Sequence, residues 1–395
     1  MIEIDGGQGE GGGQVLRTGL CLSALMGESV WIFNVCKGRK RPGLRAQHLA
    51  ATRAVAAISG GRLEGAELGS TEVGFQPQQI RGGRYRFDVT AGQTSAGATG
   101  LIFQCIAPLL LFADSPSAVS IHGGTHTAWS PPFHYLSEVF WPMVSEFGAQ
   151  GKLSLEQWGW YPQGGGKAAI WVEPVERLRA VQWAERGALL ELKGFSAASN
   201  LSPSIAKRQR HRSLTRLRTA LTSLQVEAKA QALVRPGSGL GGTVDTLSEE
   251  GLLNGQEGHF DGEPEIQILF PPAKGPGTCL FFLARYERSA AGFCSIGERG
   301  KTAEQVADEA TSAFLAHHVT GAALDPYLAD QAIIYAALAE GETIFKTSRI
   351  TAHLLTQIWV TEKILPVEFV IKGKEGKPGT IGVRGIKYQR PSRQG

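Results

Sequence analysis

His353 is one of nine histidines in this 395-residue chain, and it is the one whose setting differs from the ordinary settings of the others. An imidazole has an ordinary pKa of about 6.5, so at neutral pH it offers a free nitrogen lone pair without the desolvation that a lysine needs. The residue follows Ser348-Arg349-Ile350-Thr351-Ala352 and leads into the apolar pair Leu354-Leu355. Read alone, a histidine in this setting is more often a buried structural residue than a catalyst. Its spacing identifies no catalytic partner.

A glycine-rich loop near the N-terminus can present backbone amides to a phosphate. Residues 7–12, GQGEGG, match G-x-G-x-x-G and lie between an expected strand and an expected helix. The next strand ends in Cys36-Lys37, where a dinucleotide-binding fold needs an acid, and no Gly-Lys-Ser/Thr follows to make a P-loop. Glu10 stands among amides that favour anions. A ligand for a bound cation explains it better than a solvated turn residue, which stays the alternative.

Basic residues gather in two segments. Residues 37–45 hold five cations in a loop that leads into a helix carrying His48, and they either hold nucleic-acid phosphates or are simply solvated. Arg17 lies one turn into the helix after the glycine loop and can reach the same anion. The second segment, Lys207 to Arg218, is expected to be helical. The sequence does not decide whether it contacts a nucleic acid or only solvent.

The overall composition is that of a globular protein without a membrane span. Hydrophobic residues make up 42% of the chain and charged residues 19%, with a formal net charge of +4. No stretch reaches the roughly 18 unbroken apolar residues of a membrane helix, and the start of the chain lacks the pattern of a signal peptide. The five cysteines have no C-x-x-C spacing, which argues against zinc and a disulfide framework. We therefore expect a cytoplasmic location and no membrane partner.

The elements that must position these residues alternate between strand and helix. Short glycine clusters punctuate the chain, which holds 51 glycines, and indicate many tight turns. Apolar periodicity and β-branched runs predict strands at 2–5, 30–35, 85–89, 119–122, 165–172, 278–285 and 367–371, and helices at 14–26, 45–58, 99–112, 132–147, 302–317 and 327–338. This pattern predicts an α/β (α+β) fold, with a weak suggestion of internal repetition.

A change of composition predicts a smaller domain inserted into a larger one. The basic helical stretch begins shortly after residue 185, and the breaker run PPAKGPG ends at Gly277. We expect residues 185–277 to form the insert, and residues 1–184 together with 278–395 to form the large catalytic domain.

Four motifs in order resemble the RNA 3′-terminal phosphate cyclases. They are DGGQGEGGGQVLRT at 5–18, KGRKRPGLRAQHL at 37–49, YLADQ at 327–331 and AHLLTQ at 352–357. The resemblance runs from residue 2 to about 371 and is weakest in the insert. It implies a large domain of repeated βαβαββ-type units, like those of the translation initiation factor three C-terminal domain, with a smaller α/β domain inserted in the last unit.

The resemblance also implies the reaction. ATP would be consumed to convert the 3′-terminal phosphate of an RNA into a 2′,3′-cyclic phosphodiester, through AMP attached to His353 and then an RNA-adenylate anhydride. The physiological RNA, the nucleotide preference beyond ATP and the oligomeric state stay open.

Site residues follow from the same resemblance. It implies that Glu10 binds a divalent metal, Mg²⁺ or Mn²⁺. Arg17, Arg39 and His48 would engage the ATP phosphates or the RNA end. Nucleotide contacts would come from Gln104, Tyr327, Leu328, Ala329, Asp330 and Gln331, and Tyr327 could stack on adenine, a contact worth roughly 1–3 kcal/mol.

Two other functions compete with this one. The cyclase-like proteins of ribosomal RNA processing are non-catalytic RNA-binding relatives that lack the nucleophilic histidine, whereas this chain has both His353 and Glu10. An enolpyruvyl transferase on a similar repeated scaffold would not need that histidine. One departure from the family pattern is Gln357, where some members have asparagine, and it removes no reactive group.

Overall fold

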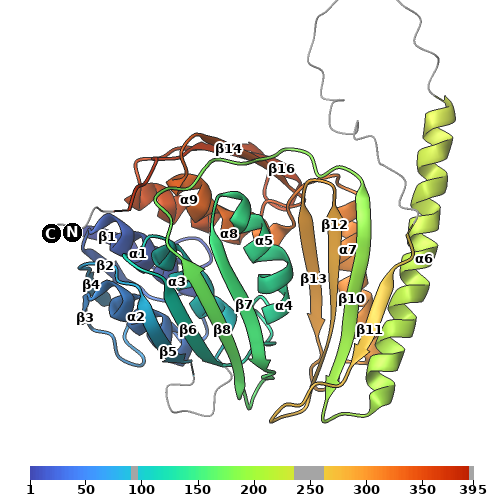
Figure 1. Cartoon of the computed structure of the whole chain (residues 1–395), viewed down its shortest axis with the longest axis horizontal. Helices are drawn as coiled ribbons and strands as arrows, with labels where there is room; N and C mark the ends of the chain where they lie inside the picture. Colours follow the sequence, from blue (N-terminus) through green and yellow to red (C-terminus); the bar gives the residue numbers. More distant parts are fainter. Residues whose placement is uncertain (90–96, 235–261, 391–395) are drawn as a thin grey trace, which may run out of the picture.

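The computed structural model describes residues 1–89, 97–234 and 262–390, with the side chains of 225–234 excepted. Figure 1 shows a large body built from most of the chain and a smaller sheet, flanked by helices, at one side of it. Part of the expected insert, 235–261, and the chain end after residue 390 lie outside the described residues. No helix in the described ranges is long and apolar enough to cross a membrane.

The first unit of the large body has the order strand, helix, strand, helix, strand, strand. Its elements are β1 (Ile2–Asp5), α1 (Gly13–Met26), β2 (Val30–Phe33), α2 (Ala46–Ser59), β3 (Arg62–Glu64) and β4 (Val73–Gln76). The strands lie in the order β1-β2-β4-β3, with β1 parallel to β2 and the other pairs antiparallel. Gly60 ends α2 in the left-handed region at φ 62°, as a glycine cap allows. The helix end expected there is confirmed.

Two further units repeat this order. The second contains β5 (Gly83–Asp88), α3 (Thr99–Leu111), β6 (Ser117–Gly123), the helical segment α4 (Phe133–Tyr135), η1 (Leu136–Phe140) and α5 (Trp141–Glu146), then β7 (Gln150–Gln157) and β8 (Gly166–Glu173). The third contains β9 (Gln182–Trp183), α8 (Pro326–Leu338), β14 (Glu342–Thr347), α9 (Ala352–Ile364), β15 (Phe369–Gly373) and β16 (Gly379–Arg384). The sheet orders, β5-β6-β8-β7 and β9-β14-β16-β15, match the first. The α/β class and the βαβαββ repeat are confirmed.

The smaller sheet is inserted between the first and second elements of the third unit. It is built from β10 (Leu189–Ser199), α6 (Pro203–Val234), β11 (Glu265–Leu269), β12 (Gly277–Tyr286), β13 (Ala290–Ile296) and α7 (Ala303–His318). The strand order is β11-β10-β12-β13, and α6 and α7 share a hydrophobic core of their own with this sheet. Strand β12 pairs with β10, and β13 pairs with β12, so the sheet continues past residue 277. The domain limits expected from the sequence stay a prediction.

Helix packing in the large body brings distant parts of the sequence together. Helix α1 packs against both α2 and α9, and α9 packs against α8. Leu16 and Leu20 of α1 and Leu354 of α9 are at most 1% exposed and belong to one continuous core. The loop before α1 therefore lies close to the first turn of α9, some 340 residues later in the chain.

Candidate active site

The glycine loop is pressed against helix α9. Gly9 has φ +62° and Gly11 has φ +56°, a region that residues with a Cβ rarely adopt. A Cβ on Gly9 would collide with the hydroxyl of Thr356, and one on Gly11 would lie 2.9 Å from the backbone nitrogen of Gly38. Glycine at position 9 lets the loop lie directly on α9, and glycine at position 11 lets it lie against the loop that follows β2. Glu10, between them, is thereby held beside the start of that helix.

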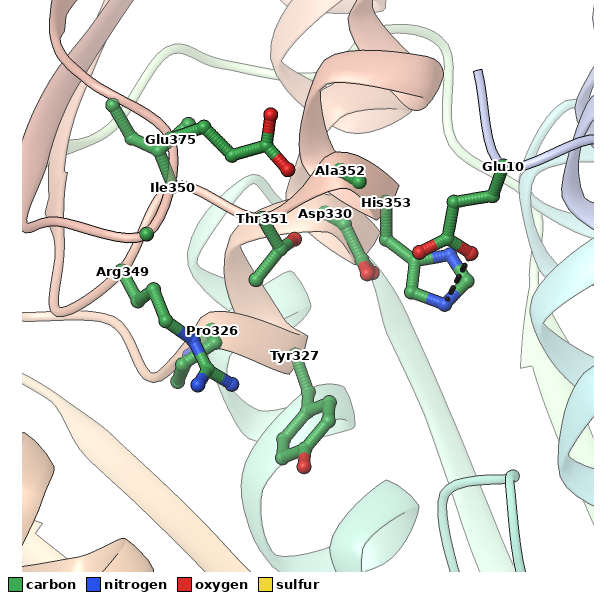
Figure 2. Close-up of a pocket in the computed structure, with 11 residues that line it drawn as sticks. Glu10, Pro326, Tyr327, Asp330, Arg349, Ile350, Thr351, Ala352, His353 and Glu375 are labelled. Atoms are coloured by element: carbon green, nitrogen blue, oxygen red, sulfur yellow. Dashed lines mark ion pairs between the residues drawn. The ribbon is translucent and has the colours of Figure 1, made fainter. Parts of the chain in front are cut away.

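His353 is the second residue of α9 and faces Glu10. Its Nε2 lies 2.9 Å from Glu10 Oε2, and its Nδ1 lies 2.9 Å from Gln14 Oε1 on α1. Thr351 caps the helix by accepting a hydrogen bond of 3.0 Å from the backbone N–H of Leu354. The cap fixes the first turn of α9 and the direction of the imidazole. Figure 2 shows the His353–Glu10 pair at one side of the pocket.

The surroundings favour the neutral form of this imidazole. Burial lowers the pKa of His353 below its ordinary value, and although the Glu10 carboxylate raises it, the positive charges of Arg17 and Arg39 lower it further. The start of α9 also disfavours a positive charge because the helix dipole is positive there. A neutral ring keeps one unprotonated nitrogen at neutral pH, which is what a nucleophile requires.

A pocket of about 320 Å³ opens beside this pair. It lies between the start of α8, the start of α9 and the turn before β16, and its lining includes Glu10, Tyr327, Asp330, Arg349, His353 and Glu375. Tyr327 is 54% exposed and meets Tyr135 edge to face, with ring centroids 6.4 Å apart. In Figure 2, Tyr327 and Arg349 lie across the pocket from Glu10. The pocket thus has an aromatic and cationic side and a side with the candidate nucleophile.

A buried carboxylate fixes the start of α8. Asp325 accepts hydrogen bonds from the backbone N–H groups of Tyr327 (2.9 Å) and Leu328 (3.0 Å) and from the hydroxyl of Tyr135 (2.9 Å). It also accepts one from the N–H of Gly292 in the smaller sheet, at 3.2 Å. Burial raises its pKa to about 6, although these hydrogen bonds lower it. The position of Tyr327 therefore depends on contacts from both parts of the molecule.

Only one face of the YLADQ segment meets the pocket. Tyr327 and Asp330 line it, whereas Leu328 and Ala329 are 0% exposed and pack in the core. Burial raises the pKa of Asp330, as do the nearby carboxylates of Asp325 and Glu10, while Arg17 lowers it. The three-residue spacing of Tyr327 and Asp330 is the helical period that places two side chains on the same face.

Two buried amides next to this region have polar atoms without partners. Gln331 Oε1 on α8 and Gln104 Nε2 on α3 have no hydrogen bond within the described part of the chain. A buried polar atom without a partner costs about 1–3 kcal/mol. Neither residue lines the 320 Å³ pocket itself. Both were predicted to bind a nucleotide, and that role stays a prediction.

The predicted phosphate ligands gather at the start of α1. A Cβ on Gly12 would lie 2.8 Å from Arg39 Nη2, and one on Gly13 would lie 2.5 Å from His48 Nε2 and 3.0 Å from Arg17 Nη1. The structure thus brings Arg17, Arg39 and His48 together around the free N–H groups of a helix start, which attract anions. The sequence places them 31 residues apart or less, and the packing of α1 on α2 unites them.

His48 is held as a neutral hydrogen-bond donor. Burial lowers its pKa to about 4, and Arg17, Arg39 and Arg45 lower it further by repulsion. Its Nδ1 accepts a hydrogen bond of 3.2 Å from the backbone N–H of Arg45. The ring proton therefore resides on Nε2, which points toward Gly13 and can donate to an anion there.

Glu10 fits a divalent cation that is bound partly by a substrate. In the part of the chain that the structure describes, no three His, Cys, Asp or Glu side chains gather closely enough to form an all-protein metal site. Mg²⁺ commonly takes one or two carboxylates and completes its shell with phosphate oxygens and water. Glu10 contacts His353 and belongs to the loop that leads to Arg17 and Arg39, so its carboxylate suits that arrangement.

Comparisons with known proteins agree on one family. The family model described as RNA 3′-terminal phosphate cyclase matches residues 8–371. Proteins named RNA 3′-terminal phosphate cyclase from Pyrobaculum aerophilum and Methylococcus capsulatus are 37% and 38% identical to this chain. The alignments cover 98% of this chain in both cases, and 99% and 97% of the two relatives. The chain belongs to the RNA 3′-terminal phosphate cyclase family.

One solved structure aligns much more weakly. The enolpyruvyl transferase NikO from Streptomyces tendae matches with a TM-score of 0.25 and 14% identity, over 44% of this chain and 33% of the other. That likeness is too low to bear on fold or function.

Three residues of this cyclase-family site escaped the sequence analysis. Arg349 and Glu375 line the pocket, and Gln14 contacts the imidazole of His353. Arg349 had a signal, since it is a cation four residues before His353 in the chain. Glu375 had none, because a glutamate in a turn is an ordinary surface residue. Gln14 lies within the motif at 5–18, but the motif does not indicate that its side chain contacts His353.

The second basic segment has its partners within the protein. On α6, Arg208 pairs with Glu304 at 2.7 Å, while Arg212 and Arg216 pair with Asp308 at 2.8 and 2.9 Å. Glu304 and Asp308 belong to α7, so these arginines join the two helices that cover the smaller sheet. Arg218 pairs with Glu263 at 2.9 Å. Four of the six lysines and arginines of this segment therefore have a carboxylate partner within the protein.

Proposed function

We propose that this enzyme of the RNA 3′-terminal phosphate cyclase family uses His353 as a nucleophile that carries AMP from ATP to the RNA end. The observation that carries the proposal is the position of the His353 imidazole: 2.9 Å from Glu10, at the edge of a pocket that also holds Tyr327 and Arg349. A non-catalytic relative would not need a neutral, pocket-facing histidine beside an acid.

In the first step, the lone pair of His353 Nε2 attacks the α-phosphorus of ATP. A P–N bond forms, the bond from that phosphorus to the bridging oxygen breaks, and pyrophosphate leaves. All reacting groups are anionic, so approach requires positive charge around the phosphates. Arg17 and Arg39, near the N–H groups at the start of α1, supply it.

In the second step, an oxygen of the RNA 3′-phosphate attacks the same phosphorus, and the P–N bond breaks with its electron pair returning to Nε2. The product is an RNA-adenylate anhydride. In the third step, the neighbouring 2′-hydroxyl attacks the RNA phosphorus and loses its proton, AMP leaves, and a 2′,3′-cyclic phosphate remains.

A divalent cation, Mg²⁺ or Mn²⁺, would be held by the carboxylate of Glu10 together with substrate phosphates, and it would supply charge neutralisation. Glu10 lies in the glycine loop two residues before Gly12, which adjoins the Arg39 side chain. The same carboxylate would also align the phosphate chain with His353.

The nucleotide base fits the other end of the pocket. Tyr327 offers an exposed ring for stacking, which typically contributes about 1–3 kcal/mol for each base. Asp330 lines the same pocket, and the unpaired amide atoms of Gln331 and Gln104 lie on adjacent helices α8 and α3. These contacts are the proposed basis of ATP binding, whereas Leu328 and Ala329, predicted as nucleotide contacts, are buried in the core and would support α8 from behind.

The basic loop at 37–45 is proposed to hold the RNA end. Arg39 faces Gly12 at the start of α1, and its neighbours Lys40 and Arg41 are exposed. In the described ranges, none of these three side chains forms an ion pair. Phosphate contacts of this kind position a nucleic acid without reading its sequence. We therefore expect a substrate defined by its 3′-phosphate and vicinal hydroxyl.

Incubation with ATP labelled at the α-phosphate and with Mg²⁺ tests the proposal. We expect an acid-labile, protein-bound AMP that is absent in His353→Ala and that disappears when an oligonucleotide with a 3′-phosphate is added, with a cyclic end as product. Absence of the adduct, or its survival in His353→Ala, would refute the nucleophile. An adduct that forms but leaves the RNA end uncyclised would assign the adenylyl transfer to another acceptor.

A further inference from the structure

We propose that Gln14, Gln357 and Thr18 form a hydrogen-bond relay that sets which nitrogen of His353 carries the proton. This inference rests on the proposed role of His353 as nucleophile and names the residues that position it. The relay runs from α1 to α9 and is not implied by any single motif in the sequence.

Three hydrogen bonds make up the relay. His353 Nδ1 lies 2.9 Å from Gln14 Oε1. The side-chain amide of Gln14 donates from Nε2 to Gln357 Oε1 at 2.9 Å, and the hydroxyl of Thr18 donates to the same oxygen at 2.8 Å. Thr18 and Gln357 are 4% and 5% exposed, so water does not compete with these contacts.

The arrangement gives the relay a direction. Two donors meet at Gln357 Oε1 and occupy both of its lone pairs. Gln14 must then turn its NH₂ group toward Gln357 and its oxygen toward His353. An oxygen accepts and cannot donate, so the proton of a neutral imidazole facing it stays on Nδ1. The lone pair is then on Nε2, the nitrogen that attacks phosphorus in the proposed reaction.

The other ring nitrogen, Nε2, lies 2.9 Å from Glu10 Oε2, which is also an acceptor. In the proposed function the Glu10 carboxylate would be engaged by a divalent cation, which leaves Gln14 as the acceptor for the ring proton. A ring protonated at Nε2 has no lone pair directed at the pocket and cannot attack. Gln14 and Gln357 are positioning residues in this scheme, since they act through His353 and touch no reacting atom.

Substitutions that remove an acceptor test the relay, with the rate of AMP attachment at saturating ATP as the readout. Gln14→Met and Gln357→Met keep the side-chain length and remove the hydrogen bonds. We expect a loss of about 10- to 100-fold in rate, the usual cost of removing a group that orients a reactive histidine, with little change in the apparent affinity for ATP. Gln209→Met, at a buried glutamine in the other hydrophobic core, is the matched control for lost stability.

Replacement by glutamate tests the direction. Gln357→Glu still accepts from both Gln14 and Thr18, and Gln14→Glu still accepts from His353 Nδ1, so both should recover most of the rate lost in the methionine variants. If Gln357→Glu fails as badly as Gln357→Met, the hydrogen bonds run the other way and the relay as proposed is wrong.

Nitrogen NMR gives a readout that a purely structural role would not move. Protein with ¹⁵N-labelled histidine is measured at pH 8 with Mg²⁺ and α,β-methylene-ATP, which blocks release of pyrophosphate, and His353→Asn identifies the signal. We expect a protonated Nδ1 and an unprotonated Nε2, reversed or mixed in Gln14→Met. A protonated Nε2 in the unmodified protein would overturn the relay. If no AMP adduct forms at all, the proposed function fails instead, so the two failures are distinct.

Discussion

Two basic segments of this chain look alike in sequence and serve different ends. The loop at 37–45 holds five cations and the stretch from Lys207 to Arg218 holds six lysines and arginines. In α6, the arginines pair with Glu304 and Asp308 of α7 and with Glu263. In the loop, Arg39, Lys40 and Arg41 form no ion pair with the described residues, and Arg39 adjoins the start of α1.

The difference teaches that charge density alone does not mark a nucleic-acid surface. A cation that already pairs with a carboxylate must give up that partner before it can neutralise a phosphate, so it contributes little to binding. An unpaired cation neutralises the phosphate directly, and the nucleic acid releases its condensed counterions. The helix arginines hold two elements together, and the loop cations are available to a ligand. The following experiments test this contrast in order of expected effect.

Arg39→Gln should give the largest effect. Loss of a cation at the start of α1 removes charge stabilisation from the transferring phosphates, and removing one such group typically costs roughly 100- to 1,000-fold in rate. The RNA-dependent rate is measured with a 3′-phosphate oligonucleotide. A decrease below about threefold would show that Arg39 is as dispensable as an ordinary surface arginine.

Acid should destabilise the surroundings of the two segments in different pH ranges, through His48 on α2 and Glu304 on α7. His48 has a folded pKa of about 4 against an ordinary value of 6.5, so its neutral form favours folding. Its contribution is complete above pH 6.5 and is lost as the pH falls from 6.5 to 4, by up to about 3 kcal/mol.

For α7, the side-chain hydrogen bond from Arg208 lowers the pKa of Glu304 from 4.5 to about 2. A carboxylate with a lowered pKa stabilises the fold above its unfolded value, and that contribution is lost as the pH falls from 4.5 to 2. Urea unfolding measured at several pH values should therefore show a weaker pH dependence between 6.5 and 4 in His48→Gln. Glu304→Gln should change only the lower range. If the free energy of unfolding fell equally steeply between pH 6.5 and 4 in His48→Gln and in the unmodified protein, the lowered pKa of His48 would be contradicted.

The double variant Lys40→Gln, Arg41→Gln should weaken RNA binding moderately. Removing two cations that are proposed to contact RNA phosphates should raise KM for an oligonucleotide about 5- to 10-fold at low salt. The slope of log affinity against log salt concentration should become shallower by about 0.7 for each phosphate that is no longer neutralised. Formation of the AMP adduct, which needs no RNA, should not change.

The matched control for that variant is Lys207→Gln, His211→Gln on α6, where both side chains are exposed. This pair should leave both KM and its salt dependence as they are. If the α6 control weakened RNA binding as much as the loop variant, the contrast between the two segments would be wrong.

Asp308→Asn should have the smallest effect and should act on stability alone. Asp308 accepts from Arg212 and Arg216 and has a lowered pKa, chiefly through its hydrogen bonds with Arg212. The pair is partly exposed and screened by water, so the loss is about 1 kcal/mol of unfolding free energy. The measurement is urea unfolding, with cyclase activity per folded molecule expected to stay constant. A loss of activity without a loss of stability would place α6 and α7 in the RNA path.

Much of the fold followed from local patterns. Strand 2–5 and the helices expected at 14–26, 45–58 and 99–112 match β1, α1, α2 and α3 within one residue at each end. Such segments are predictable because apolar spacing and glycine caps act over a few residues. Strands β3, β4, β14 and β16 are among those that were not predicted, because strands of three to six residues contain too few alternating positions to give a clear pattern. The threefold equivalence of the sheets became evident only from strand order.

The site divides in the same way. The sequence alone determined the chemical identity of the groups proposed to react: an imidazole at residue 353, a carboxylate amid glycines at residue 10, and cations at 17 and 39. It could not determine that Gln14 contacts His353, or that Leu328 and Ala329 face the core, because these facts depend on how α1, α8 and α9 pack. Nor could it tell the free cations of the loop from the paired ones of α6. Chemical identity is a property of each residue, whereas hydrogen bonding, charge pairing and proton position depend on neighbours that only the tertiary structure supplies.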